Sequence, residues 1–335
     1  MFFSIKSLDK YRATFNFVLG GRGTGKTYGA FKTMLEKNVR FIYMRRTQTE
    51  LDLISGGDAL GDLNPFRQIN KDLNREIGFE KINKSVYGIF DFGNDKKLIG
   101  YALALSTVCN LRGFDASDVE IIIFDEFIPE THARPIKNEA TAFFNAYETV
   151  NRNREFASPQ RPPVIVYLLA NSNNIANPIM METGITKKLE RMLLKNKKFM
   201  KLDDMSVTVT IIDDAELKEK KSKSALYKLT KNSKFSEMSL ENKFAFNDFT
   251  GVAVKPIIEF KPFCAIKNVY IYKHKSRNEY YATRNKHNIN TYGDCEQAVR
   301  SFNANYGRLI YGAYLTKTIN YEDIGVKEEL LSLIL

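Results

Sequence analysis

The chain has 335 residues, 44% of them apolar, which is enough to bury one large hydrophobic core or two smaller ones. It contains no long uninterrupted apolar window, and its first residues lack the apolar segment of a signal peptide. We therefore expect a cytoplasmic protein without a membrane partner. The three cysteines and three histidines are too widely separated to indicate a disulfide framework or a zinc site.

The net charge of +11 is unevenly distributed along the chain. Residues 1–186 carry a net charge of +2, whereas residues 187–335 carry +9. A basic second half after a nearly neutral first half favours a nucleic-acid-binding region that follows a catalytic domain. The alternative is an ordinary basic surface exposed to solvent.

The first 200 residues alternate between predicted strands and predicted helices. Strands are predicted at residues 14–20, 40–44, 86–92, 97–105, 119–124 and 164–170. Helices are predicted at residues 25–37, 65–77, 136–150 and 185–197. This alternation predicts an α/β domain of three layers with a mainly parallel sheet, and we assign residues 1–200 to it.

A glycine-rich loop lies between the first predicted strand and the first predicted helix. It matches the pattern G-x-x-x-x-G-K-[ST] at every position, through Gly20, Gly21, Arg22, Gly23, Thr24, Gly25, Lys26 and Thr27. The glycines allow backbone N–H groups to surround a phosphate, and the helix directs the positive end of its dipole toward the same phosphate. In this motif Lys26 reaches the β- and γ-phosphates of ATP, and the Thr27 hydroxyl is a ligand of Mg²⁺. The alternative is a chance glycine-rich turn that enters a helix.

A second motif occupies residues 119–126, where a β-branched apolar run ends in Asp125 and Glu126. Such a run is typical of a central strand in a parallel sheet, and the carboxyl ends of these strands are where open α/β sheets bind ligands. Asp125 is expected to hold Mg²⁺, and Glu126 to orient and deprotonate the attacking water. An acidic pair alone is common in turns. Together the two motifs predict a P-loop NTPase domain of the ASCE type that hydrolyses ATP.

The remaining residues are predicted to form a linker and a small second domain. Residues 201–234 are assigned to the linker, because their lysine-rich part has little apolar content and indicates a linker or a solvated helix. Residues 235–335 are assigned to an α+β domain. Its strands are predicted at residues 251–260, 264–273 and 280–283, and its helices at residues 296–306 and 327–335.

Several polar residues near these motifs are candidates for contacting the γ-phosphate, in their own subunit or in a neighbouring one. Arg152 and Arg154 follow a predicted helix at a place where ring-shaped NTPases present an arginine to the neighbouring subunit's γ-phosphate; the alternative is that they complement the helix dipole. Arg112 precedes the acidic strand and is a candidate for a similar role, or a solvated loop residue. Asn171 ends the next strand, where it can bond the attacking water or the γ-phosphate, or belong to an ordinary Asn-rich turn.

Two further arginines, Arg45 and Arg46, end the second predicted strand. Their position near the predicted carboxyl edge of the sheet leaves two interpretations open. They contact phosphates of nucleotide or DNA, or they pair with nearby acidic side chains.

These residues resemble the DNA-packaging ATPases of the phi29-like bacteriophages. Similar blocks occur in the same order in that family, at residues 16–27, 41–46, 124–128, 152–155 and 177–178. A further block, residues 237–242, resembles one that lies early in the family's second domain.

The resemblance implies a homomeric ring, five subunits in the family, docked on the portal (connector) of an empty capsid. Such a ring hydrolyses ATP with Mg²⁺ to move double-stranded DNA inside, and some members sit on a structural packaging RNA. The protein would then work in the host cytoplasm, transiently at the portal vertex of the procapsid. Arg152 aligns with the family's trans-acting arginine, and Arg112 with a lysine ascribed to communication between subunits.

The resemblance also implies a C-terminal domain similar to an RNase H-type nuclease that has lost its metal-binding acids. A two-metal nuclease needs clustered carboxylates at strand ends. The predicted strand at residues 251–260 offers only Glu259, and the one at residues 264–273 offers none. We therefore expect a domain for binding nucleic acid or the capsid, without an active nuclease site.

Two other functions remain open from the sequence. One is an enzyme like the large terminases, which both translocates and cuts DNA. The other is a nucleotide-dependent capsid assembly factor that moves no DNA. Nuclease activity would favour the first of these, whereas stimulation of ATP hydrolysis by duplex DNA would argue against the second.

Overall fold

The computed structural model describes residues 3–56, 59–111, 115–130, 133–231, 233, 236 and 247–334, with the backbone alone at residues 109–111. These residues form two compact units. The first comprises the described parts of residues 1–174 and 195–245, and the second those of residues 175–194 and 246–335.

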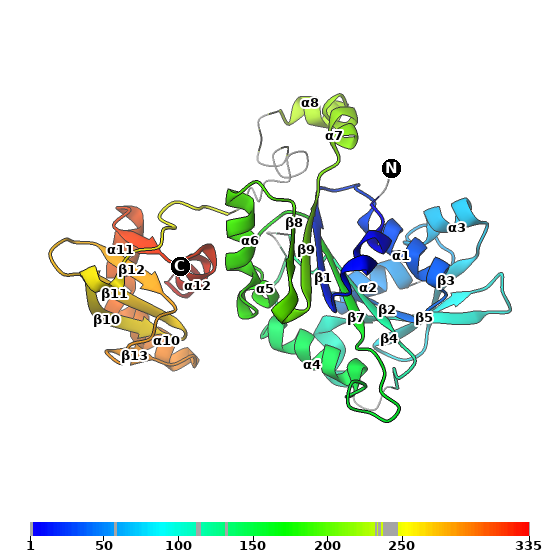
Figure 1. Ribbon diagram of the computed structural model, residues 1–335, viewed down its shortest axis with the longest axis horizontal. Coiled ribbons are helices and arrows are strands. Elements are labelled where there is room, and N and C mark those ends of the chain that lie inside the picture. Colours follow the sequence, from blue (N-terminus) through cyan, green and yellow to red (C-terminus); the bar gives the residue numbers. More distant parts are fainter. Residues whose placement is uncertain are drawn as a thin grey trace. The chain divides into compact units, whose positions relative to one another are not determined.

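The described part of the first unit is built on a nine-stranded sheet (Figure 1). Its strands are β1 (Phe15–Gly20), β2 (Phe41–Arg45), β3 (Ile77–Lys81), β4 (Val86–Asp91), β5 (Lys97–Ala104), β6 (Ile121–Asp125), β7 (Ile165–Ala170), β8 (Phe199–Leu202) and β9 (Val207–Ile212). Their spatial order is β3-β4-β5-β2-β6-β7-β1-β9-β8. The six strands from β5 to β9 in this order are parallel, and β3, β4 and β8 are antiparallel to their neighbours.

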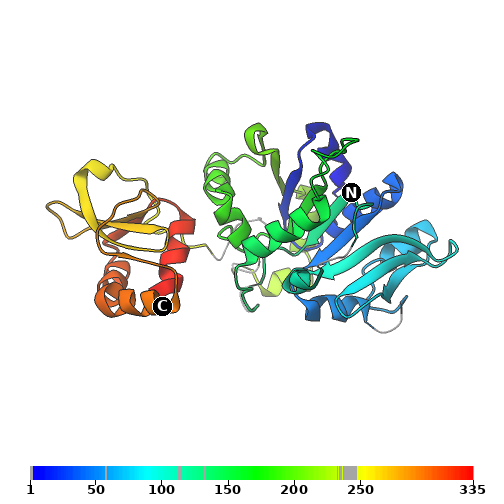
Figure 2. The ribbon, with the colours of Figure 1, turned by 90° about the horizontal axis from the view of Figure 1, so that it is seen from below.

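Helices cover both faces of this sheet, so the unit has three layers. The helices of the first unit are α1 (Lys26–Lys37), α2 (Gln48–Ser55), α3 (Arg67–Leu73), α4 (Glu139–Asn151), α7 (Ala215–Ser222) and α8 (Ala225–Leu229), with short 3-10 helices at Ile5–Tyr11, Leu105–Leu111 and Asp203–Met205. Figure 2 shows α4 lying across the strands in the view from below.

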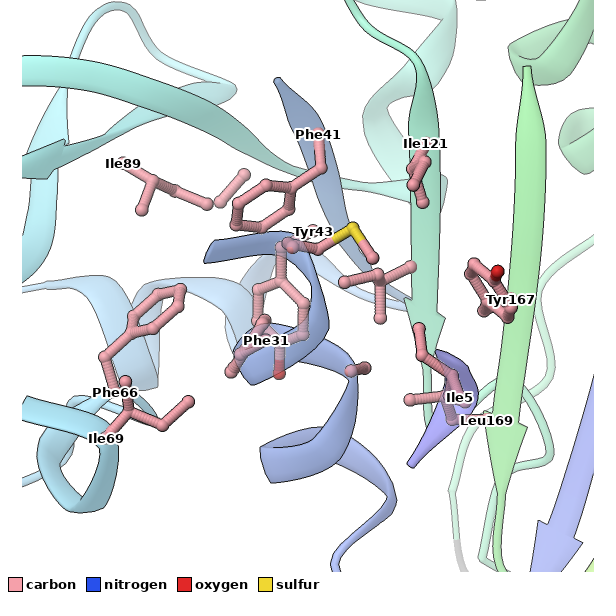
Figure 3. Packing of buried hydrophobic residues seen from close by; sticks show 14 of the residues in the cluster. Ile5, Phe31, Phe41, Tyr43, Phe66, Ile69, Ile89, Ile121, Tyr167 and Leu169 are labelled. Atoms are coloured by element: carbon pink, nitrogen blue, oxygen red, sulfur yellow. The ribbon is translucent and has the colours of Figure 1, made fainter. Parts of the chain in front are cut away.

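The apolar side chains of the central strands alternate between the two faces. On one face Phe31 of α1 lies edge-on to Tyr43 of β2, with ring centroids 4.9 Å apart, within the cluster drawn in Figure 3. Ile123 of β6 belongs to the same cluster. The next residue, Phe124, points to the opposite face and stacks on Phe143 of α4 at 5.8 Å. Burial on both faces explains why β6 reads as an unbroken apolar run.

The linker predicted at residues 201–234 begins later than expected. Residues 207–212 form β9, which pairs in parallel register with β1 along its whole length. The threonines of this strand weakened its apolar pattern. One of them, Thr208, is buried and donates a hydrogen bond to Asn16 Oδ1 at 2.6 Å. The lysine-rich part that follows forms α7 and α8, which carry no buried residue, as expected of solvated helices.

Another difference lies at the end of the helix predicted at residues 65–77. Helix α3 ends at Leu73, because Asn74 takes the left-handed conformation with φ +48°. Residues 77–81 then form β3, which pairs antiparallel with β4.

The second unit combines a small sheet with helices. Its elements are α5 (Pro178–Glu182), α6 (Ile185–Leu194), β10 (Phe260–Ile266), β11 (Val269–His274), β12 (Tyr280–Thr283), β13 (Thr291–Tyr292), α10 (Glu296–Phe302), α11 (Arg308–Leu315), β14 (Ile319–Tyr321) and α12 (Ile324–Ile334). The sheet order is β13-β10-β11-β12-β14, with an antiparallel meander from β10 to β12. Its core includes Phe302, Ile310 and Leu330.

Two of its predicted strands are wrong. In residues 251–256 only Val252 forms a β-bridge, an isolated one with Tyr321, and a short 3-10 helix spans Ile257–Glu259. The strand therefore begins only at Phe260. The strand predicted at residues 264–273 is a hairpin of β10 and β11, which turns at Lys267 with φ +51°. Among the described helices none has the length and apolar character required to span a membrane.

A buried ion pair joins the end of β2 to the start of α4. Arg46 donates to Glu139 through Nε at 2.7 Å and through Nη2 at 3.1 Å, and both side chains are at most 2% exposed. The two-bond geometry and the lack of solvent make this a strong contact. Of the two interpretations of Arg46, the structure supports pairing with an acid.

We predict that Glu139→Ala lowers the free energy of unfolding by about 3–5 kcal/mol, because it leaves the Arg46 charge buried without its partner. Urea denaturation measures the loss. Glu216→Ala is the control, since it removes one partner of the exposed Lys220–Glu216 pair and should change stability little. Equal stability of the two variants would contradict this role of the buried pair.

Candidate nucleotide site

The phosphate-binding loop joins β1 to α1 at the carboxyl edge of the sheet. Gly23 and Gly25 have φ values of +72° and +78°, a left-handed conformation that glycine adopts without strain. Gly20 meets a different constraint. A Cβ atom there would lie 3.0 Å from the Cβ of Ile212 on the neighbouring β9. The sequence therefore folds here into the strand, loop and helix that the motif predicts.

Lys26 lies in the centre of this loop and is only 8% exposed. Its Nζ donates to the carbonyls of Gly20 and Gly21, each at 3.0 Å, and to Asn171 Oδ1 at 3.2 Å. Burial lowers the pKa of Lys26 to about 8; the carboxylate of Asp125 opposes this shift. An ammonium that is poorly solvated and held by neutral carbonyls is well prepared to bind a phosphate anion.

Asp125 ends β6 and is buried directly beside Thr27, the second residue of α1. The Thr27 hydroxyl lies 3.1 and 3.0 Å from the two carboxylate oxygens, and the Tyr43 hydroxyl donates to Oδ2 at 3.1 Å. Burial raises the pKa of Asp125, and the charge of Arg45 opposes that rise. A hydroxyl and a carboxylate in contact supply the oxygen ligands that Mg²⁺ prefers, so Thr27 and Asp125 fit the predicted metal ligands.

Glu126 turns away from the sheet immediately after Asp125. Its φ of +54° is unusual for a residue with a side chain, and such conformations cluster at functional sites. Its side chain is 52% exposed and accepts a hydrogen bond from Arg45 Nη2 at 2.6 Å. Arg45 also lies 3.5 Å from Asp125 Oδ2. Arg45 therefore pairs with acidic side chains, as one of the two interpretations held.

These side chains line one pocket of about 260 Å³. The lining consists of residues 22–28 with Asp125, Glu126, Ala170 and Asn171. A larger cavity of about 490 Å³ lies at the opposite ends of the strands, where Thr14 and Ile165 precede or begin β1 and β7. The smaller pocket alone contains the glycine loop and the acidic pair.

Arg152 and Arg154 lie at that opposite edge of the sheet, away from the pocket of their own chain. Arg154 is 5% exposed and donates to the carbonyl of Ser117 at 3.2 Å, shortly before β6 begins. Arg152 is more exposed and pairs with Asp115 at 3.2 Å. Arg112 lies outside the described residues. Of the predicted polar residues, the pocket thus brings together Lys26, Thr27, Asp125, Glu126 and Asn171. Arg152 and Arg154 do not line it.

The sequence did not identify three contacts of this site. Tyr43 contacts Asp125 from the adjacent strand β2, and Arg22 of the loop pairs with Glu130. Lys221, from the stretch predicted to be a linker, donates to the carbonyl of Arg22. Only strand pairing and the path of the chain after β9 bring these groups together, so local patterns carry no signal for them.

Comparison with known proteins identifies the family. The model of the Podovirus DNA encapsidation protein (Gp16) family matches residues 1–266. The chain belongs to this family. This confirms the resemblance to the packaging proteins of the phi29-like phages.

Individual relatives support the assignment. The DNA packaging protein of Bacillus phage phi29 is 28% identical over 249 residues, which cover 73% of this chain and 66% of the relative. That of Bacillus phage B103 is 30% identical over 240 residues, covering 70% and 65%. These matches span slightly less than two thirds of the relatives' own length.

Solved structures share the fold. The N-terminal domain of the DNA packaging ATPase from bacteriophage phi29 is 27% identical with a TM-score of 0.50, covering 64% of this chain and 98% of that domain. A chain of the bacteriophage Phi-29 viral genome packaging motor assembly has a TM-score of 0.67 at 22% identity, covering 100% and 99%. The mixed α/β architecture with a large parallel sheet is therefore confirmed.

The lowered pKa of Lys26 predicts how stability depends on pH. The ammonium titrates near 8 in the folded protein and near 10.5 when unfolded, so the unfolded chain binds more protons between these values. The free energy of unfolding of the wild type should therefore rise, relative to Lys26→Met, by on the order of 3 kcal/mol as the pH increases from 7 to 11. Denaturant unfolding of both proteins across this range measures the difference. A stability difference between the two proteins that stays the same at every pH would contradict the lowered pKa of the buried Lys26 ammonium.

Proposed function

We propose that this protein is an ATP-hydrolysing ring motor that moves double-stranded viral DNA into a preformed capsid through its portal. The observation that carries the proposal is the convergence of Lys26, Thr27, Asp125 and Glu126 on one pocket, in a chain of the DNA encapsidation family. A loop for phosphates, oxygen ligands for a divalent cation and an exposed carboxylate are the parts that hydrolysis of a nucleoside triphosphate requires.

Each residue has a distinct role in this proposal. Lys26 and the loop N–H groups bind the phosphates, and Asn171 positions the Lys26 ammonium at 3.2 Å. Thr27 and Asp125 hold Mg²⁺, which neutralises charge on the phosphates when bound. Glu126 takes the proton of the attacking water, and Arg45 orients that carboxylate. The placement of β7 between β1 and β6 supports the ASCE type of P-loop NTPase.

The ring arrangement is proposed because Arg152, the predicted trans-acting arginine, does not line the pocket of its own chain. Arg152 is exposed at the opposite edge of the sheet and is suited to a neighbouring subunit's γ-phosphate. Arg154 is buried and donates to the carbonyl of Ser117, near Asp115, the ion-pair partner of Arg152. We propose a ring of five subunits, as the family resemblance implies, with communication through Arg112.

The remaining partners follow from charge and family. The basic half of the chain, residues 187–335 with net charge +9, would contact DNA phosphates, the portal or a structural packaging RNA. The described residues contain no group of three or more His, Cys, Asp or Glu suited to a metal ion. We propose, as the family resemblance implies, that the second domain is related to RNase H and inactive as a nuclease. We propose that the motor acts in the host cytoplasm, at the portal vertex.

The proposal is tested by packaging with Glu126→Gln. This variant keeps the size and hydrogen bonding of the side chain but removes the base, so ATP should still bind while turnover falls by roughly 10²-fold or more. In a mixture with DNA, ATP and portal-bearing empty capsids, the wild type should protect DNA from added nuclease and the variant should not. Glu182→Gln, on α5, is a matched control. Wild-type ATPase activity without DNA protection would contradict a packaging motor.

A trans role for Arg152 predicts complementation between subunits. Arg152→Ala and Glu126→Gln should each be inactive alone, because each removes one side of a shared site. Their mixture should recover part of the ATPase rate, because some interfaces then combine an intact Arg152 with an intact Glu126. ATPase rates are measured against the mixing ratio, with ring formation verified by light scattering. Rings that are inactive at every ratio would count against action between subunits.

A further inference from the structure

Helix α7 lies against the phosphate-binding loop although it buries no residue of its own. It follows β9 along the chain (Figure 1). The last residue of β9, Ile212, pairs with Gly20 at the start of the loop. Asp214 caps the helix by accepting a hydrogen bond from the N–H of Leu217 at 2.9 Å. Since no residue of α7 is buried, a polar contact rather than apolar packing joins this helix to the loop.

The contact between the helix and the loop is made by Lys221. Its ammonium donates to the carbonyl of Arg22, and Nζ lies 3.5 Å from the place where a Cβ atom on Gly23 would stand. Burial lowers the pKa of Lys221. The same is true of Lys26, where burial is the main cause and the charge of Lys221 adds to it. Two partly desolvated ammonium groups, those of Lys26 and Lys221, therefore donate hydrogen bonds to carbonyls of the same loop.

The other lysines at the end of α7 differ from Lys221. Lys220 and Lys223 are 72% and 71% exposed, and each pairs with a glutamate one turn earlier on the helix. Lys221, in contrast, has a neutral carbonyl as its hydrogen-bond acceptor. A phosphate oxygen carries full negative charge and is a stronger acceptor for an ammonium than a carbonyl is.

We propose that Lys221 is a further ligand of the phosphates of the bound nucleoside triphosphate, supplied by the same chain from helix α7. This inference rests on the proposed nucleotide site. The flexible stem of lysine lets the ammonium pass from the Arg22 carbonyl to a phosphate beside Gly23. A phosphate contact of Lys221 would make the position of α7 depend on the nucleotide.

The test compares three variants of the full-length protein in equilibrium binding of a fluorescent, non-hydrolysable ATP analogue with Mg²⁺. Lys221→Ala should weaken binding about tenfold or more, as the loss of a hydrogen bond to a charged group implies. Lys221→Gln can still donate to the Arg22 carbonyl but carries no charge, so it should weaken binding similarly. Lys223→Ala, at the residue that caps the end of α7, should bind as the wild type does.

Amide hydrogen exchange gives a second readout. The nucleotide should slow exchange in residues 215–229 of the wild type and of Lys223→Ala, but not of Lys221→Ala. Wild-type affinity of Lys221→Gln would overturn the proposal, because a contact to the Arg22 carbonyl would then suffice. Wild-type affinity of Lys221→Ala would overturn it as well. If the wild type itself binds no nucleotide, the proposed function fails and this inference fails with it.

Discussion

The buried carboxylate of Asp125 is the group around which the site is organised. It takes hydrogen bonds from Thr27 on α1 and from Tyr43 on β2, and it lies near Arg45, also on β2. Two segments, α1 and β2, thus meet the end of β6 at one side chain. A buried carboxylate is costly unless it is paired and hydrogen-bonded. These partners meet that requirement, and the same contacts place the phosphate loop beside the acidic strand.

The topology of the sheet makes this meeting possible. β1, β6 and β7 run parallel, so the glycine loop, the acidic pair and Asn171 all follow strand ends at one edge. The chain returns to the opposite edge through α4, which leaves Arg152 there. The candidate nucleotide site therefore lies at one edge and the exposed Arg152 at the other, the arrangement that the proposed ring requires if a neighbour completes each site.

Much of the candidate nucleotide site could be predicted from the sequence because its signals are local. The glycine loop imposes its own backbone geometry, and the apolar run of β6 reflects burial on both faces. β9 was missed because its buried Thr208 finds its partner, Asn16, far away along the chain. The hairpin of β10 and β11 was misplaced because its turn at Lys267 lacks glycine. The contact of Lys221 with the loop could not be predicted from the sequence, because only tertiary structure brings α7 to the loop.

The central claim is that Asp125 and Thr27 form a Mg²⁺-dependent nucleotide site. Its most direct test is the dissociation constant of a non-hydrolysable ATP analogue, measured with Mg²⁺ and with a chelator, for the wild type and Asp125→Asn. The account predicts that Mg²⁺ tightens binding to the wild type and that Asp125→Asn, which keeps the shape of the side chain but loses its charge, abolishes this gain. An equal gain from Mg²⁺ in both proteins would contradict it.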